Sequence, residues 1–275
     1  MKVQLAEKHG FCFGVQRAID IAEQHPNAKT IGPLIHNPRE INRLKENFSI
    51  EVIEDAEQVG TIDAEALIIR THGITKESLQ NLQGKNKKII DATCPFVTKP
   101  QEICAKMSEE NYQVVIFGDA EHPEVKGVKS YGEGVIIVKN ADELKKYKLK
   151  RRVAIISQTT KNIEDFQKVV DALIKISTEV RVFNTICNAT LENQEAAYDL
   201  SKKADIMIII GGKNSSNTKQ LWQICKTHCQ ESYLIESREE IESSWFQDKQ
   251  LCGITAGAST PKWIIDETKN IIEKI

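Results

Sequence analysis

The stretch Asp91-Ala92-Thr93-Cys94-Pro95-Phe96-Val97-Thr98-Lys99-Pro100 places a cysteine between two kinds of secondary structure. The apolar run 88–90 comes directly before it and predicts a short strand. Ile103 and Met107, four residues apart, follow it and predict a helix. We therefore expect Cys94 in a turn that leads from the end of a strand into a helix.

The same order of strand, cysteine and helix occurs twice more in the chain. Cys12 follows an expected strand at 2–5, and Cys187 follows the stretch Val180-Arg181-Val182-Phe183. Three cysteines at three equivalent turns suggest one shared metal site.

Fixed spacings after these cysteines indicate an internal repeat. A glycine ends an apolar run 24 residues after each of the last two cysteines, and a polar residue, His122 or Ser215, lies 28 residues after each. The first copy is shorter and leads from Cys12 to the loop around His36. Each copy then contains another apolar strand that ends in small polar residues, at 71–73, 157–160 and 255–260.

Helical patterns that alternate with short, continuous apolar strands predict parallel sheets covered by helices. We therefore expect an α/β protein of three small domains around a pseudo-threefold axis, with Cys12, Cys94 and Cys187 meeting at the centre. The third domain is complete only if the N-terminal strand supplies its last strand. The expected domains are 13–94, 95–187, and 188–275 together with residues 1–12.

Composition narrows the class of protein. The 275 residues are 40% hydrophobic and 28% charged, as in an ordinary globular protein. A net charge of −2 gives no basic field for nucleic acid or an anionic membrane. The N-terminus lacks the apolar core of a signal peptide, and no apolar run approaches the ~18 residues of a membrane span. We therefore expect a cytoplasmic protein, in which the seven cysteines stay reduced.

Three converging thiolates can hold zinc or an iron–sulfur cluster. Their spacings of 82 and 93 residues match no paired C-x-x-C zinc motif, so the repeat is the stronger evidence. A cubane cluster with three protein ligands leaves one iron open to a substrate or water. The alternative is three buried cysteines that act as small apolar residues, which their expected place in strand-end loops disfavours. We expect the other cysteines, at 104, 225, 229 and 252, to lie in the core.

Polar side chains in the strand-end loops predict an anion-binding cradle. These are His36, His72 and His122 in the first two copies and Ser215, Ser216, Asn217 and Ser259 in the third. Imidazole, hydroxyl and amide donors, with backbone N–H groups at helix starts, suit phosphate oxygens. A single loop histidine is more often a surface residue, but the matched positions favour a binding role.

Glu124 and Thr159 lie in the same set of loops. Glu124, two residues after His122, is a candidate proton relay near a metal and phosphates. Its alternative role is a charge that complements a helix dipole. Thr159 is a candidate to hold a water or a substrate hydroxyl, and its alternative role is a helix cap.

Together these loops resemble the 4-hydroxy-3-methylbut-2-enyl diphosphate reductases, the IspH (LytB) family of the non-mevalonate isoprenoid route. The matching stretches are 10–15, 32–37, 70–73, 91–95, 121–124, 157–160, 185–190, 215–217 and 256–261. They cover essentially the whole chain, and no functional position of the family pattern is substituted.

The resemblance implies a [4Fe–4S] cluster on Cys12, Cys94 and Cys187 with one open iron site. It also implies a substrate, (E)-4-hydroxy-3-methylbut-2-enyl diphosphate, which loses its hydroxyl as water and yields isopentenyl and dimethylallyl diphosphates. The implied diphosphate ligands are His36, His72, His122, Ser215, Ser216, Asn217 and Ser259. Glu124, with Thr159, would organise the proton path and the substrate hydroxyl. A ferredoxin or flavodoxin is the expected electron donor.

Two other classes of protein fit part of the pattern. An iron–sulfur electron carrier or redox sensor needs the cysteines but no diphosphate cradle. The second class is a structural zinc protein that has three cysteine ligands and binds a phosphometabolite. The histidine and Ser-Ser-Asn loops favour the enzyme.

Overall fold

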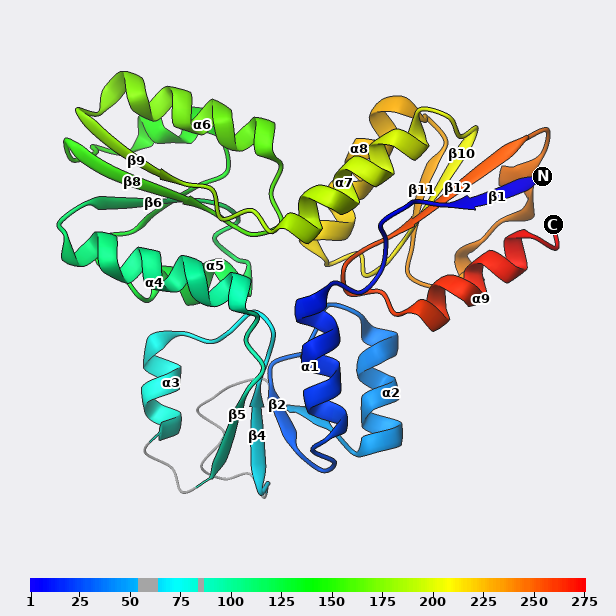
Figure 1. Ribbon diagram of the computed structural model, residues 1–275, viewed down its shortest axis with the longest axis horizontal. Coiled ribbons are helices and arrows are strands. Elements are labelled where there is room, and N and C mark those ends of the chain that lie inside the picture. Colours follow the sequence, from blue (N-terminus) through cyan, green and yellow to red (C-terminus); the bar gives the residue numbers. More distant parts are fainter. Residues whose placement is uncertain (54–63, 84–86) are drawn as a thin grey trace. The chain divides into compact units, whose positions relative to one another are not determined.

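Three parallel sheets form the framework of the chain (Figure 1). The structure is a computed structural model and describes residues 1–53, 64–83 and 87–275. The first sheet along the chain contains β2 (Lys29–Ile31), β3 (Glu51–Ile53), β4 (Ala66–Ile69) and β5 (Lys88–Asp91). The second contains β6 (Gln113–Phe117), β7 (Ile136–Val138), β8 (Arg152–Ser157) and β9 (Glu179–Phe183). The third contains β10 (Ile206–Ile210), β11 (Ser232–Ile235), β12 (Leu251–Ala256) and β1 (Lys2–Leu5).

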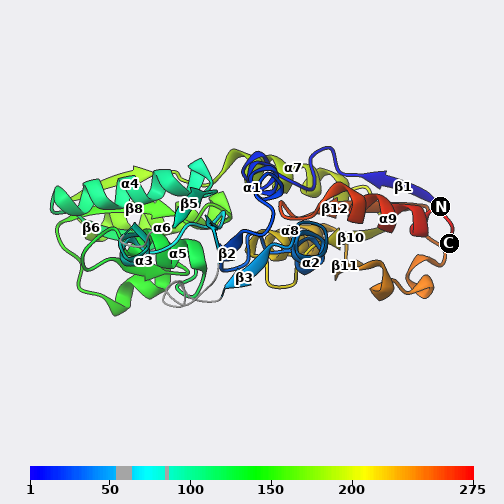
Figure 2. The ribbon, with the colours of Figure 1, turned by 90° about the horizontal axis from the view of Figure 1, so that it is seen from below.

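All three sheets have the same strand order. The orders are β3-β2-β4-β5, β7-β6-β8-β9 and β11-β10-β12-β1, and every neighbouring pair is parallel. The N-terminal strand β1 lies beside β12, with Lys2 opposite Leu251 and Leu5 opposite Ile254 (Figures 1 and 2). The predicted repeat of α/β units is therefore confirmed, as is the completion of the third sheet by the N-terminus.

Helices follow the strands, as parallel connections require. They are α1 (Phe13–Glu23), α2 (Pro38–Phe48), α3 (Lys76–Gln83), α4 (Pro95–Glu109), α5 (Pro123–Lys129), α6 (Ile163–Ile176), α7 (Asn188–Ser201), α8 (Ser216–His228) and α9 (Lys262–Ile272). The short 3₁₀ helices are η2 (Ala141–Lys146), η3 (Arg238–Glu240) and η4 (Ser243–Phe246). Among the described residues, no helix is both long and apolar enough to cross a membrane.

The central strand β10 shows why the inner strands of these sheets appear in the sequence as continuous apolar runs. All five of its residues are buried. Ile206, Ile208 and Ile210 pack in one core cluster with Ile264 of α9. Met207 and Ile209 point to the other face and pack in a cluster that includes residues of α7 and α8. Because successive side chains of a strand point to opposite faces, a strand covered by helices on both faces must be apolar throughout.

The edge strands β3, β7 and β11 were not identified from the sequence. Each has only three or four residues and pairs with a single neighbour. The three residues of β3 form no continuous apolar run, whereas β7 lies in the apolar run 135–138, which is as long as the run 66–69.

The chain divides into two compact units. The first contains Met1–Gln16, His36–Arg43 and Asn188–Ile275, and therefore the third sheet. The second contains Arg17–Ile35 and Leu44–Cys187, and therefore the other two sheets. The exact boundaries of three separate domains stay a prediction.

Candidate functional site

The three repeat cysteines follow the fourth strands of their sheets, and the same backbone hydrogen bond holds each of them. In each case the cysteine N–H donates to a carbonyl oxygen in the loop after the third strand. The bonds join Cys12 to Ala258 (3.2 Å), Cys94 to Thr71 (3.0 Å) and Cys187 to Thr159 (2.9 Å). The repeat therefore extends into the loops, and each cysteine is tied to a loop that carries a candidate site residue.

Exposure separates these cysteines from the other four. Cys12, Cys94 and Cys187 are partly exposed, whereas the other cysteines, at 104, 225, 229 and 252, are buried. Burial raises the pKa of the thiols at 104, 225 and 252 to about 12, so they stay protonated. Because metals bind the thiolate, only the three loop cysteines suit a cluster. The expected core position of the other four is confirmed.

In the second unit, Glu124 and Thr159 form a buried pair. The backbone N–H of Thr159 donates to one carboxylate oxygen of Glu124 and its hydroxyl donates to the other, both at 2.7 Å. Glu124 is only 2% exposed. Burial raises the pKa of its carboxyl, and the two hydrogen bonds from Thr159 oppose that shift. A buried carboxyl that can hold a proton at higher pH is suited to proton transfer.

The alternative role of Thr159 as a helix cap is wrong. Asn162 caps α6 instead, because its side chain accepts hydrogen bonds from the backbone N–H groups of Glu164 and Asp165. The carbonyl oxygen of Thr159 accepts the bond from Cys187, so this residue touches both a candidate cluster ligand and the buried carboxyl.

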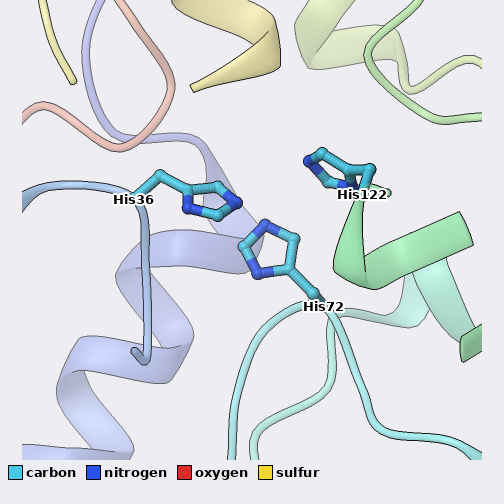
Figure 3. Close-up of side chains that lie close together, drawn as sticks. All are labelled: His36, His72 and His122. Atoms are coloured by element: carbon cyan, nitrogen blue, oxygen red, sulfur yellow. The ribbon is translucent and has the colours of Figure 1, made fainter. Parts of the chain in front are cut away.

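His72 and His122 lie together in the same unit (Figure 3). Their ring centroids are 5.4 Å apart, and the rings meet edge to face. Nδ1 of His122 accepts the backbone N–H of Glu124 at 3.3 Å. Thr71 lies beside His72 and donates its hydroxyl to the carbonyl oxygen of Leu34 at 2.8 Å, which fixes the loop. Both imidazoles are partly exposed, so a ligand can reach them.

Arg17 is a supporting residue that the sequence analysis missed. Its guanidinium donates to the carbonyl oxygens of Thr93 (3.3 Å) and Asp91 (3.4 Å), just before Cys94. Arg17 lies in the helix that follows Cys12, so one cationic side chain supports the loop of another cysteine. In the sequence, Arg17 stands out only because it lies five residues after Cys12. That position does not indicate a contact with Thr93, which is 76 residues away.

In the first unit, three of the serine and asparagine candidates lie at the start of α8, and Ser216 and Asn217 belong to its first turn. Ser215 caps α8, and its hydroxyl oxygen accepts the N–H of Thr218 at 3.3 Å. Asn217 is 4% exposed, and neither polar atom of its side chain has a hydrogen-bond partner among the residues that the structure describes. A buried amide without partners costs free energy unless a ligand or water completes it. The Asn217 side chain can therefore form hydrogen bonds with a group from outside the chain.

The remaining candidates of this unit are His36, Ser216 and Ser259, all partly exposed. The backbone of His36 approaches Gly212 so closely that a Cβ atom at Gly212 would lie 2.5 Å from the His36 carbonyl oxygen. Only glycine fits this contact, which brings His36 against the loop that leads to Ser215. Ser259 follows Ala258, whose carbonyl oxygen accepts the bond from Cys12.

Comparisons with known proteins identify the family of the chain. The model of the LytB protein family matches residues 3–273. A 4-hydroxy-3-methylbut-2-enyl diphosphate reductase of a Nitratiruptor species is 58% identical over 275 residues, covering 100% of this chain and 99% of that protein. One from Campylobacter concisus is 59% identical over 276 residues and covers 100% of both chains.

Solved structures give the same result. A structure of (E)-4-hydroxy-3-methyl-but-2-enyl diphosphate reductase is 41% identical, with a TM-score of 0.71 and full coverage of both chains. The E-1-hydroxy-2-methyl-but-2-enyl-4-diphosphate reductase from Plasmodium falciparum is 26% identical, with a TM-score of 0.91 over 98% of this chain and 87% of that chain. The family prediction is confirmed, and the chain belongs to the LytB protein family.

Proposed function

We propose that this chain reductively removes the hydroxyl group of (E)-4-hydroxy-3-methylbut-2-enyl diphosphate as water and yields isopentenyl and dimethylallyl diphosphates. The reductase activity follows from relatives of 58% and 59% identity that carry this name over their whole length. A relative of 41% identity is described as the terminal enzyme of the non-mevalonate pathway. This favours the enzyme over an electron carrier or redox sensor. The structural observation that carries the proposal is Thr159, which joins the buried acid Glu124 to the backbone of Cys187.

The cofactor in this proposal is a [4Fe–4S] cluster on Cys12, Cys94 and Cys187, with one iron open to substrate. Their partial exposure supports it, because the other cysteines are buried and those at 104, 225 and 252 hold their protons. When bound, such a cluster supplies electrons and a Lewis-acidic iron.

The diphosphate is proposed to bind the cradle of histidine, serine and asparagine side chains. Its members are His36, His72, His122, Ser215, Ser216, Asn217 and Ser259. The unpartnered amide of Asn217 supports this role, because diphosphate oxygens would accept its N–H groups. Holding the anionic end fixes the short carbon chain, so binding free energy is converted into orientation of the C–O bond.

Glu124 is the proposed proton donor, and Thr159 orients the substrate hydroxyl. While Glu124 is ionised, the Thr159 hydroxyl donates to it. When Glu124 holds a proton, the carboxyl becomes the donor and Thr159 becomes the acceptor. The Thr159 hydroxyl hydrogen is then released to bond the leaving oxygen, and the proton can move from Glu124 through Thr159 to that oxygen. The raised pKa of Glu124 keeps the acid form available.

Three further features belong to the proposal. The electrons come from a small donor protein, a ferredoxin or flavodoxin. The enzyme works in the cytoplasm, where its thiols stay reduced. Its domains are 13–94, 95–187, and 188–275 with residues 1–12, each built on one of the three sheets.

Anaerobic reconstitution with iron and sulfide, followed by a reduction assay with the hydroxymethylbutenyl diphosphate and a chemical reductant, tests the proposal. We expect a brown protein that turns over the substrate, and we expect Cys94→Ser to lose cluster and activity. Cys104→Ala is the matched control, because this buried thiol has a raised pKa and should keep the cluster. A colourless protein with stoichiometric zinc would exclude both iron hypotheses. A stable cluster without turnover would favour the electron carrier.

A further inference from the structure

Glu40, in the first turn of α2, is a buried carboxylate in the first compact unit. It is 1% exposed, and both of its oxygens are bonded. One accepts from Nε (2.9 Å) and Nη2 (2.6 Å) of Arg43, one turn further along α2. The other accepts from the indole Nε1–H of Trp263 at 2.9 Å, 223 residues away at the start of α9. Breaking either contact leaves a buried charge incompletely paired, which is costly.

Trp263 contributes this hydrogen bond rather than core packing. Its side chain is 39% exposed, so much of its apolar surface stays in water. The guanidinium of Arg39 lies over the indole ring at 4.6 Å and pairs with Glu267 of α9 at 3.0 Å. Two polar links therefore fasten the first turn of α2 to α9.

The fastened turn begins two residues after His36. Asn37 caps it: its side-chain oxygen accepts the N–H of Glu40 at 3.1 Å, and its carbonyl oxygen accepts that of Ile41 at 3.1 Å. On the other side, the His36 carbonyl oxygen abuts Gly212. The backbone at His36 is thus held between the first turn of α2 and the loop that leads to Ser215.

We propose that Glu40 and Trp263 are positioning residues for diphosphate binding. Their hydrogen bond fixes the His36 segment against the loop 211–217, so that the imidazole and the α8 loop serve the same anion. This inference rests on the proposed function of His36 as a diphosphate ligand. Neither residue touches the substrate in this proposal, because both act through the backbone of the first turn of α2.

Trp263→Phe in the cluster-loaded full chain tests the inference. It removes the indole N–H and keeps an aromatic ring for Arg39, while one oxygen of the buried Glu40 loses its donor. We expect the KM for the hydroxymethylbutenyl diphosphate to rise about tenfold, the size of effect that an unsatisfied buried group produces, with kcat and the cluster absorption unchanged. Trp245→Phe is the matched control, because this Trp lies in the same unit and stacks on Tyr233, away from Glu40. It should leave KM unchanged.

A double-mutant cycle separates positioning from general stability. If Trp263 acts through His36, Trp263→Phe should add nothing to the KM of His36→Ala, because coupled residues give non-additive effects. Fully additive effects, an unchanged KM, or an equal loss of kcat and cluster would overturn the inference. If Trp263→Phe yields no folded protein, Glu40→Leu, which removes the acceptor of the indole N–H, takes its place in the cycle under the same criteria.

Affinity for inorganic pyrophosphate, measured by calorimetry on the same variants, keeps this test distinct from that of the proposed function. A wild-type protein without turnover would contradict the reductase proposal. A tenfold weaker pyrophosphate affinity in Trp263→Phe, abolished in the His36→Ala background, would still support the positioning role. Unchanged pyrophosphate affinity beside an active wild type would contradict positioning alone.

Discussion

Residues 122–124 after β6 and residues 215–217 after β10 occupy equivalent places in the repeat, because each set is the end of a loop and the first two residues of the next helix. Each begins a helix, and each has a side chain that caps it. Nδ1 of His122 accepts the N–H of Glu124, and the Ser215 hydroxyl oxygen accepts the N–H of Thr218, both at 3.3 Å. Both helices therefore begin in the same way, with a side chain that accepts one of the first N–H groups, which have no partner within the helix.

The two loops differ in how their third residue is satisfied. Glu124 is buried with a partner on each oxygen, both from Thr159. Asn217 is equally buried, and its side chain has no hydrogen-bond partner within the described part of the chain. A titratable group with internal partners is suited to hold and move a proton, whereas an unpartnered amide is suited to bind something from outside. The same backbone frame thus carries a carboxyl group at one position and an unpartnered amide at the equivalent position of the other copy.

The largest expected effect comes from Glu124→Gln. The amide keeps the shape of the carboxyl but cannot supply its proton, so kcat should fall about 10²- to 10⁴-fold. Cluster absorption and KM should stay close to wild type, because the cradle is untouched. Steady-state kinetics under anaerobic conditions measure this.

Glu121→Gln is the control for this variant. It removes a carboxylate from the same loop, but Glu121 is exposed and pairs with Lys126 at 2.7 Å. A pair of this kind contributes little to stability, so activity should be unchanged. Full activity of Glu124→Gln would remove this residue from the mechanism and the contrast between the loops with it.

Asn217→Ala should give the next largest effect, on binding instead of turnover. Loss of the amide donors should raise KM roughly tenfold, the expected cost of one lost hydrogen bond to a charged group, with a smaller change in kcat. The free energy of unfolding should not fall, because the variant removes a buried amide that has no partner in the described chain. Steady-state kinetics measure the change in KM, and denaturant unfolding measures the change in the free energy of unfolding.

Asn214→Ala changes the same kind of residue in the same loop and serves as the control. Asn214 is exposed, so its substitution should alter neither KM nor stability. An unchanged KM in Asn217→Ala, or a clear loss of stability, would show that the amide is a structural residue.

The repeat explains why so much of this fold could be predicted. Every unit contains buried parallel strands, which appear in sequence as short apolar runs such as 206–210. A fixed 24-residue spacing from cysteine to glycine then aligns the last two copies. The edge strand β3 was not predicted, because its three residues are too few to show an alternating or continuous apolar pattern. The third copy of the repeat lacks a last strand, which predicted that the N-terminal strand completes it, and the pairing of β1 with β12 confirms this prediction.

The sites were predictable where they follow strand ends and unpredictable where they depend on long-range contacts. Cys94 and Glu124 lie between the end of a strand and the first turn of the next helix, at a place that the topology dictates. Arg17 contacts a loop 76 residues away, and Trp263 contacts Glu40 across 223 residues. These contacts arise when separate elements pack, and neither charge nor periodicity in the sequence identifies the partner.

The smallest expected effect is a pH-dependent stability that only the Glu124 loop should show. Burial raises the pKa of this carboxyl above its ordinary value of 4.5. Between 4.5 and the raised value the folded state therefore binds more protons than the unfolded state, so stability falls as the pH rises through that window. Each unit by which the pKa is raised corresponds to about 1.4 kcal/mol.

Glu124→Gln removes this titration, so the difference in the free energy of unfolding, variant minus wild type, should grow as the pH rises above 4.5 and level off above the raised pKa. Anaerobic urea unfolding of both proteins at a series of pH values measures that difference. Asn217→Ala, which changes no titratable group, should differ from wild type by the same amount at every pH. A pH-independent difference for Glu124→Gln would mean that the carboxyl is not desolvated in the folded protein. The two loops would then differ only in their hydrogen-bond partners, and not in their capacity to hold a proton.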